Sequence, residues 1–166
     1  MNQLPNHKVP RLDSPGEKYR EKQLMVQLPR QDLSEAYCRY LEAGSRRAFI
    51  DFVMVRNEMA LDIAYVKDTL PTDMDCRKCQ GALQAGDLAV FAPKFGEQVA
   101  WHPACFVCHR CDELLVDLTY CVKDGNLFCE RHYAETIKPR CAACDEGCDA
   151  VYMYGIRMTD ADTDAT

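Results

Sequence analysis

Eight cysteine and histidine residues between positions 76 and 132 are spaced as metal ligands, and this series constrains the fold more than any other feature of the chain. They form four pairs, each with two residues between its members: Cys76 and Cys79, His102 and Cys105, Cys108 and Cys111, Cys129 and His132. Tetrahedral zinc prefers thiolate sulfur and neutral imidazole nitrogen, and a Cys-x2-Cys turn brings two sulfurs to one ion. Eight such ligands predict two zinc sites.

The order of the pairs along the chain predicts which ligands share an ion. A Cys-x2-Cys turn supplies two ligands, and the next pair completes the tetrahedron from across a hairpin. The first zinc ion is therefore expected to bind Cys76, Cys79, His102 and Cys105, and the second Cys108, Cys111, Cys129 and His132. Only Phe106 and Val107 separate the two sets, so the two zinc modules must abut, and we expect Phe106 to be buried between them.

Both predicted sites are closed by four protein ligands, which is typical of structural zinc. A catalytic zinc ion instead keeps one position open for water and has an acid or base beside it. The sequence also lacks a Gly-rich phosphate loop, a nucleophile motif and an H-E-x-x-H helix. We therefore predict that the chain is not an enzyme, and that it takes two structural Zn2+ ions and no small-molecule substrate.

The ligand register resembles that of the LIM domain, a double zinc finger, without a substitution at any ligand position. Residues 101–108, 113–117 and 131–133 look like the first LIM domain of the testin and prickle family in particular. The resemblance implies a LIM zinc-binding domain over residues 74–137. Alternating apolar residues and turn signals predict short antiparallel hairpins near 88–101 and 118–128, followed by a short helix near Arg131 to Ile137.

The first 70 residues are predicted to be mostly helical. Residues 1–16 are rich in proline and polar residues, so we expect them to be disordered. A first helix is predicted from Glu17 to Gln27, before Pro29. The capping signal Asp32-x-x-Glu35 predicts a second helix. Its apolar stripe of helical period consists of Leu33, Ala36, Tyr37, Tyr40 and Leu41.

A third helix is predicted after Gly44, with Ser45 as its cap, through Phe52 toward Leu61. It is apolar on more than one face, which indicates burial against the other two helices. Residues 17–70 resemble the PET domain that precedes LIM domains in testin and prickle. The matching residues are Tyr19-Arg20-Glu21-Lys22-Gln23-Leu24, Gln27-Leu28-Pro29, Gln31-Asp32, Tyr37-Cys38-Arg39, Phe52, Arg56 and Ala60-Leu61.

The two resemblances together cover residues 17–148 and predict the architecture of the chain. It is a small α+β fold in which a helical PET-like domain, residues 17–70, precedes the LIM hairpins. The segment Pro71-Thr72-Asp73 marks the expected boundary, and Asp62-Ile63-Ala64 replaces glycines that are usual in the family. We expect the aromatic stripe in the helical block to pack in an ordinary hydrophobic core, and favour this over a dedicated binding groove.

The resemblance breaks off after residue 137. Residues 138–146 look like the opening of a second LIM domain, but the next His-x2-Cys pair does not follow. A truncated isoform or a gene model that reads into an intron would each explain the acidic segment that comes instead. We therefore predict that residues 138–166 are an incomplete second LIM start and a disordered acidic tail, with Cys141, Cys144 and Cys148 as free thiols. A third metal site at these cysteines, completed by water or another chain, is the less favoured alternative.

A disulfide framework is the main alternative for so many cysteines, as in small secreted domains. The interleaved histidines argue against it, as does a start at Met1 without the basic and apolar segments of a signal peptide. No stretch approaches the roughly 18 apolar residues that a membrane helix needs. We therefore expect a soluble, intracellular chain with reduced thiols. Cys38, Cys121 and His109 are out of register with the ligand series and are expected to be ordinary helix, strand and surface residues.

The charge distribution weighs against nucleic-acid binding. The formal net charge is −6, and residues 141–166 carry one basic and six acidic side chains. No basic face emerges for phosphate contact. The leading hypothesis is a zinc-dependent protein-interaction adaptor that presents strand edges and apolar patches. The alternative is a transcriptional cofactor or nucleic-acid-associated zinc-finger protein.

The resemblance to the PET–LIM family adds a cellular setting to the adaptor hypothesis. It implies cytoskeletal, adhesion or polarity proteins as partners. It also implies a cytoplasmic location, at adhesions or cell junctions, with the nucleus as a further possibility.

Overall fold

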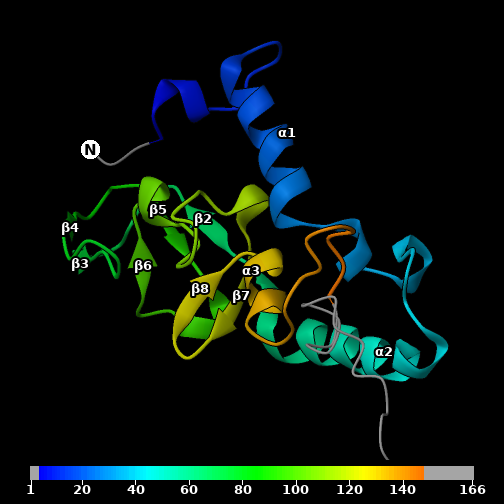
Figure 1. The fold of residues 1–166 in the computed structure, drawn as a ribbon. Helices are drawn as coiled ribbons and strands as arrows, with labels where there is room; N and C mark the ends of the chain where they lie inside the picture. The colour runs from blue at the N-terminus through cyan, green and yellow to red at the C-terminus, as the bar shows by residue number, and fades with distance from the viewer. Residues whose placement is uncertain (1–3, 148–166) are drawn as a thin grey trace, which may run out of the picture.

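The computed structural model describes residues 4–147, in which three α-helices accompany three small antiparallel sheets (Figure 1). The helices are α1 (Pro15–Gln27), α2 (Arg46–Val55) and α3 (Glu130–Glu135). One sheet has the order β1-β7-β8, formed by Leu61–Ile63, Thr119–Lys123 and Asn126–Phe128. The second has the order β2-β5-β6, formed by Tyr65–Lys67, Ala89–Phe91 and Ala100–Trp101. The third pairs β3 (Met74–Asp75) with β4 (Ala82–Leu83), and the small α+β fold class is confirmed.

The predicted hairpins of the zinc modules are present. β5 pairs with β6, and β7 returns through the turn at Asp124 and Gly125 to β8. The terminal helix α3 is one residue earlier at its start than expected. Phe106 is 1% exposed and makes edge-to-face contacts with Trp101 of the first module and Tyr120 of the second. The prediction of a small aromatic core between the modules is therefore confirmed.

Helix α1 begins two residues before its predicted start. The hydroxyl of Ser14 accepts a hydrogen bond from the amide of Glu17 at 3.2 Å, and Pro15 occupies the first helical turn. A serine cap followed by proline is a favourable helix start. A short 3-10 turn covers Asn6–Lys8. The residue after it, Val9, packs closely against the start of α1, since a Cβ on Gly16 would lie 2.0 Å from the Val9 carbonyl oxygen. The expected disorder of residues 1–16 is thus wrong for residues 4–16, and residues 1–3 lie outside the described part.

The predicted second helix is not formed. Two 3-10 turns, Arg30–Asp32 and Glu35–Tyr37, take its place. The apolar stripe does not make a core, since Leu33, Tyr37 and Tyr40 are 42%, 57% and 64% exposed. The backbone amide of Tyr40, like that of Arg39 before it, donates to the carboxylate of Glu146, more than 100 residues away in the sequence. This tertiary contact competes with the local helical pattern and holds the chain extended.

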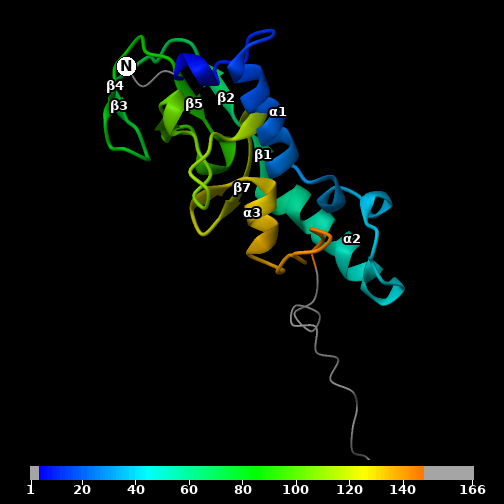
Figure 2. The same cartoon turned by 45° about the horizontal axis from the view of Figure 1, so that its top comes forward.

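The third helix is present, but its burial was overestimated. Helix α2 continues into a π-helical turn, Arg56–Ala60, and ends there. No residue of α2 itself is buried, although its sequence is apolar on more than one face, and Ser45 makes no side-chain capping bond. Only Arg56 and Ala60 of the π turn are buried. In Figure 2, α1 and α2 lie on the same side of the strands, and α2 projects away from the zinc modules.

The segment from Leu61 to Lys67 joins the helical block to both zinc modules, which the sequence patterns do not indicate. β1 pairs antiparallel with β7 of the second module, and β2 pairs antiparallel with β5 of the first. Between them, Ala64 is 4% exposed and its amide donates to the Leu118 carbonyl at 2.9 Å. One continuous extended segment therefore adds a strand to each of two sheets, ahead of the expected boundary at Pro71.

Candidate metal centre

The first cluster of predicted ligands is assembled as expected. The ligand atoms of Cys76, Cys79, His102 and Cys105 all lie within 4.8 Å of one another. The Cys-x2-Cys turn is closed by two backbone hydrogen bonds, from the Cys76 amide to the Gly81 carbonyl at 2.9 Å and from the Gln80 amide to the Cys76 carbonyl at 2.8 Å. Gln80 has a φ of 58°. This left-handed residue turns the chain so that both sulfurs face the same point.

The imidazole of His102 is oriented for its role in this cluster. Its Nδ1 atom lies 3.4 Å from the Cys79 sulfur and 3.8 Å from the Cys105 sulfur. Its Nε2 atom lies 3.3 Å from the carbonyl oxygen of Ala82. A carbonyl on the far ring nitrogen fixes the tautomer of a metal-binding histidine. The geometry therefore leaves Nδ1 as the ring nitrogen that His102 can offer to a metal ion.

The second cluster brings Cys108, Cys111, Cys129 and His132 together, again with all ligand atoms within 4.8 Å. The turn repeats the first one, with bonds from the Cys108 amide to Glu113 at 3.0 Å and from the Asp112 amide to Cys108 at 2.9 Å. Cys129 precedes α3 and His132 lies in its first turn. The His132 Nδ1 atom is 3.1 Å from the Cys129 sulfur. Its Nε2 atom faces the Glu135 carboxylate at 3.8 Å.

Within each cluster, the close packing of the sulfurs shifts the pKa values of different cysteines in opposite directions. Burial, together with the neighbouring sulfurs of Cys76 and Cys79, raises the pKa of the Cys105 thiol to about 12. A hydrogen bond with Cys129 lowers the pKa of Cys108 to about 3, and the same bond raises the pKa of Cys129. So many thiolates cannot ionise side by side without a cation. A divalent soft metal removes this conflict, so the donor set fits zinc.

The third Cys-x2-Cys pair is ordered, contrary to expectation. Residues 138–147 pack against the N-terminal block beside α2 and are drawn in orange in Figure 1. The predicted disorder of residues 138–166 is therefore wrong for residues 138–147. The cause is the burial of Arg140 and Glu146, which pair with groups of the helical block. Cys148 and the acidic segment after it lie outside the described residues.

Three further residues, Cys38, Cys121 and His109, are out of register with the ligand series and make ordinary contacts in the fold. Cys121 is buried in β7. Cys38 follows a 3-10 turn, and its thiol donates to the carbonyl of Gln31 at 3.2 Å. His109 is exposed and packs edge-to-face on Phe128 at 5.6 Å between ring centroids. The expectation of a surface role for His109 is confirmed.

Polar residues of α1 dock on the second zinc module, and sequence reasoning assigned them no role. The side-chain amide of Gln27 donates to the Leu114 carbonyl at 2.8 Å and accepts from the Val116 amide at 3.0 Å. The Tyr19 hydroxyl donates to the Glu113 carboxylate at 2.6 Å. Gln27 and Tyr19 belong to the residues shared with the PET domain, which is the signal that could have marked them.

Comparison with known proteins supports both resemblances. A family model described as PET Domain matches residues 1–67, and one described as LIM domain matches residues 76–137. No solved structure matches the chain significantly.

Several curated relatives match most of the chain. "Protein espinas" of Drosophila pseudoobscura pseudoobscura is 51% identical over 146 residues, which cover 88% of this chain and 18% of that protein. "Prickle-like protein 2" of Homo sapiens is 48% identical over 146 residues, covering 86% and 17%. "Protein prickle" of Drosophila melanogaster is 46% identical over 146 residues, covering 88% and 11%. The chain thus spans less than a fifth of the length of these relatives.

These matches decide several of the expectations. The LIM domain binds zinc, and the two ligand clusters are suited to two ions, so the predicted Zn2+ cofactors are confirmed. The LIM domain is a protein-interaction module, which confirms the prediction that the chain is not an enzyme. The boundaries at 17–70 and 74–137 and the role of each ligand stay predictions. Residues 1–67 thus belong to the PET domain family and residues 76–137 to the LIM domain family, and the chain is similar to the prickle and espinas proteins.

Proposed function

We propose that this chain is a zinc-dependent protein-interaction adaptor whose docking surface is shaped by two zinc ions. The observation that carries the proposal is the closure of both clusters by cysteine and histidine alone, with the ligand atoms of each within 4.8 Å. The proposed ligands are Cys76, Cys79, His102 and Cys105 for the first ion, and Cys108, Cys111, Cys129 and His132 for the second. Four protein ligands leave no position for a reacting water.

The docking surface is proposed to lie along the outer edge of β1 and β2. Both are edge strands in their sheets, so one side of each has backbone groups without a strand partner. Ile63 is 63% exposed and Val66 is 41% exposed. An extended peptide can add to such an edge through its main chain and place side chains against the apolar residues. In the sheets, β7 is already paired with β1 and β5 with β2. We therefore restrict the hypothesis of docking on strand edges to the unpaired edges of β1 and β2.

Helix α3 supports a protein partner over a nucleic acid. A DNA-reading finger needs free cationic side chains on its helix. Glu130 at the start of α3 is buried. Arg131 pairs with Asp145 and with Glu135, the latter at 3.2 Å. The charge of this helix is thus largely neutralised within the chain.

The cellular setting is carried over from the family as part of the proposal. We propose partners among polarity, cytoskeletal or adhesion proteins, and a cytoplasmic location at junctions or adhesions, with the nucleus as an alternative. Within residues 4–147, no helix combines the length and the apolar character that crossing a membrane requires.

Proximity labelling in cells tests the adaptor proposal. The chain is compared with a Cys129→Ala/His132→Ala variant, which removes two ligands of the second ion, and with Ile63→Lys/Val66→Lys, which changes the proposed edge but no ligand. Both variants should lose the same partners. The matched control is Met54→Lys on α2, where the side chain is 53% exposed and no loss is expected. An unchanged partner list in the ligand variant would contradict the proposal.

A further inference from the structure

A groove opens between the two zinc modules, at the edges of the sheets opposite β1 and β2. The strands at these edges are β6 and β8, which contribute Trp101 and Leu127 to its lining. The first zinc-binding turn contributes Arg77 and the second contributes His109. The cavity has a volume of about 380 Å3, a size typical of ligand-binding clefts. A ligand in this inter-module groove would contact both modules at once.

The floor of the inter-module groove is aromatic and apolar, with one unused donor. Trp101 is 2% exposed and lies edge-on to Phe95, with the ring centroids 5.2 Å apart. Val107 and Leu127 are buried beside it and also line the groove. Within residues 4–147, no group accepts a hydrogen bond from the indole nitrogen of Trp101, and that nitrogen is not sealed in the interior. The floor therefore offers an N–H donor to a ligand.

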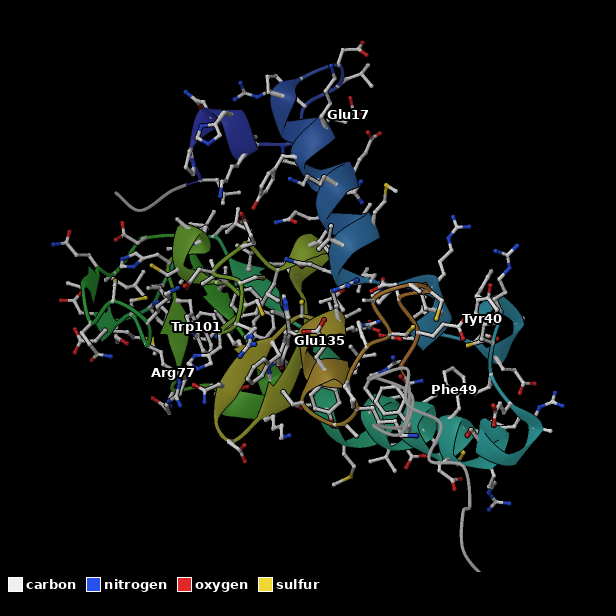
Figure 3. The ribbon with its side chains drawn as sticks, viewed as in Figure 1. Glu17, Tyr40, Phe49, Arg77, Trp101 and Glu135 are labelled. Carbon is white, nitrogen blue, oxygen red and sulfur yellow. The ribbon has the colours of Figure 1, made fainter. Side chains whose placement is uncertain are left out.

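The guanidinium of Arg77 is held beside Trp101 (Figure 3). The backbone amide of Arg77 donates to the carbonyl of Ala100, the residue before Trp101, at 2.9 Å. The guanidinium stacks on the ring of Phe95 at 5.1 Å and donates to the Gly125 carbonyl at 3.1 Å. In the described part of the chain this is its single side-chain hydrogen bond. Because a guanidinium has five N–H donors, others stay open to a ligand.

The charge of the lining favours an anionic ligand. The Lys78 ammonium is matched by the Asp112 carboxylate at 2.6 Å. Arg77 has no carboxylate partner among residues 4–147, so the acidic and basic side chains of the lining leave one positive charge unmatched. A planar guanidinium beside an N–H donor suits one carboxylate, whereas phosphate is usually bound by clusters of arginine. The expected ligand group is therefore a single carboxylate.

We propose that the inter-module groove docks an acidic segment of a partner protein. One carboxylate of this segment accepts hydrogen bonds from the Trp101 indole and the Arg77 guanidinium, and an apolar neighbour packs on Val107 and Leu127. Such charge-assisted hydrogen bonds are about twice as strong as neutral ones. The groove and the edges of β1 and β2 lie at opposite edges of the sheets, so the groove is a second docking surface and either can fail alone.

The indole signal of Trp101 tests the proposal directly, since the chain has one tryptophan. The probe is a peptide selected from a random peptide library on the zinc-loaded full chain. We expect an aspartate or glutamate next to an apolar residue, and a downfield shift of the indole N–H signal in proton–nitrogen correlation NMR. Replacing the acid by its amide should weaken binding at least about tenfold.

Three results of this experiment would overturn the proposal. The first is a library that yields no acidic peptide. The second is an indole signal of Trp101 that a bound acidic peptide leaves unchanged. The third is tighter binding when phosphoserine replaces the acid, because the groove would then be a phosphate site.

Two variants locate the contact on the chain. Trp101→Phe removes the indole N–H but keeps an aromatic ring against Phe95 and Phe106. Arg77→Gln removes the charge. Each should weaken binding of the labelled peptide at least about tenfold in fluorescence polarisation. Native mass spectrometry should still find two zinc ions per chain, which shows that the loss is not unfolding.

The matched control is Arg110→Gln. Arg110 is an exposed arginine of the second zinc-binding turn that does not line the groove. Its loss should leave the affinity nearly unchanged, because exposed charges outside a contact contribute little. Ile63→Lys/Val66→Lys, at the edges of β1 and β2, should also leave it unchanged, which separates this proposal from the preceding one. Equal losses for Arg110 and Arg77 would reduce the effect to general charge and contradict the proposal.

Discussion

The guanidinium of Arg56 lies 3.3 Å from the carboxylate of Glu130, and the two side chains are only 2% and 5% exposed. Arg56 comes from the π turn after α2, and Glu130 begins α3 of the LIM domain. The same guanidinium donates to the backbone carbonyl of Asp32 at 2.7 Å. Burial raises the pKa of Glu130 although Arg56 acts in the opposite direction. This pair therefore fastens the helical block to the zinc module.

Replacing Arg56 by methionine should destabilise the chain strongly. The change leaves Glu130 buried without its counter-ion, which typically costs about 3–5 kcal/mol in the free energy of unfolding. The measurement is chemical unfolding of the zinc-loaded protein. The double variant Arg56→Met/Glu130→Met should recover most of the loss, because no unpaired charge remains.

The control for this prediction is Arg47→Met. Arg47 pairs with Asp51 on the exposed face of α2, where the arginine side chain is 87% exposed. An exposed pair contributes at most about 1 kcal/mol. Equal losses for Arg47 and Arg56 would contradict the role assigned to the buried pair.

Removal of zinc should unfold the LIM domain. Structural zinc in small domains contributes on the order of 10 kcal/mol per site to folding. A strong chelator is therefore expected to abolish the cooperative thermal transition and to alter the far-ultraviolet spectrum. The variant Cys108→Ala should do the same for the second site, whereas His109→Ala, one residue further along, should leave both zinc ions in place. A thermal transition that the chelator does not change would contradict the assignment of the two structural sites.

Gln27→Leu should weaken the docking of α1 on the zinc module. The change removes two hydrogen bonds, and the Val116 amide loses its acceptor in a buried position. An unsatisfied buried group of this kind costs about 1–3 kcal/mol. Hydrogen exchange at the Val116 amide should accelerate, while the amide of Tyr120, in β7, should change less. The comparison variant is Lys18→Leu on an outward position of the same helix.

The contact between Tyr19 and Glu113 should make stability depend on pH in the acid range. The hydrogen bond from the Tyr19 hydroxyl lowers the pKa of Glu113 below its ordinary value of 4.5. Partial burial acts in the opposite direction, and the charge of Lys8 lowers the pKa further. A depressed carboxyl pKa stabilises the fold above the unfolded value and loses this effect as pH falls through the folded value. Tyr19→Phe should therefore raise the pKa of Glu113, measured by NMR titration of its side chain. Tyr37→Phe, at an exposed tyrosine, should not change it.

The zinc-binding half of the structure could be predicted because its signals are local and chemical. Ligand spacing identified both clusters, and alternating residues such as Leu118, Tyr120 and Val122 predicted the hairpin that positions Cys129. Phe106 could be placed between the modules because only one residue besides it separates the two ligand sets. These inferences need no knowledge of contacts distant in the sequence.

The helical block was less predictable because distant contacts decide it. The stripe from Leu33 to Leu41 has helical period, yet Glu146 takes the amides of Arg39 and Tyr40 that a helix would use. The strands β1 and β2 are three residues each, too short for a periodic signal, and they form because β7 and β5 have open edges to pair with. Order in residues 138–147 likewise depends on Asp32, which no local pattern connects to Arg140.

The segment from Leu61 to Lys67, which contains β1 and β2, holds the two zinc modules in a fixed relative orientation. Modules joined only through Phe106 and Val107 could pivot about that short connection. Here one uninterrupted backbone is bonded to both sheets, with Ala64 seated at the joint. The angle between the two zinc modules is therefore fixed by the fold of the chain itself. A partner that contacts both modules must be complementary to this fixed shape.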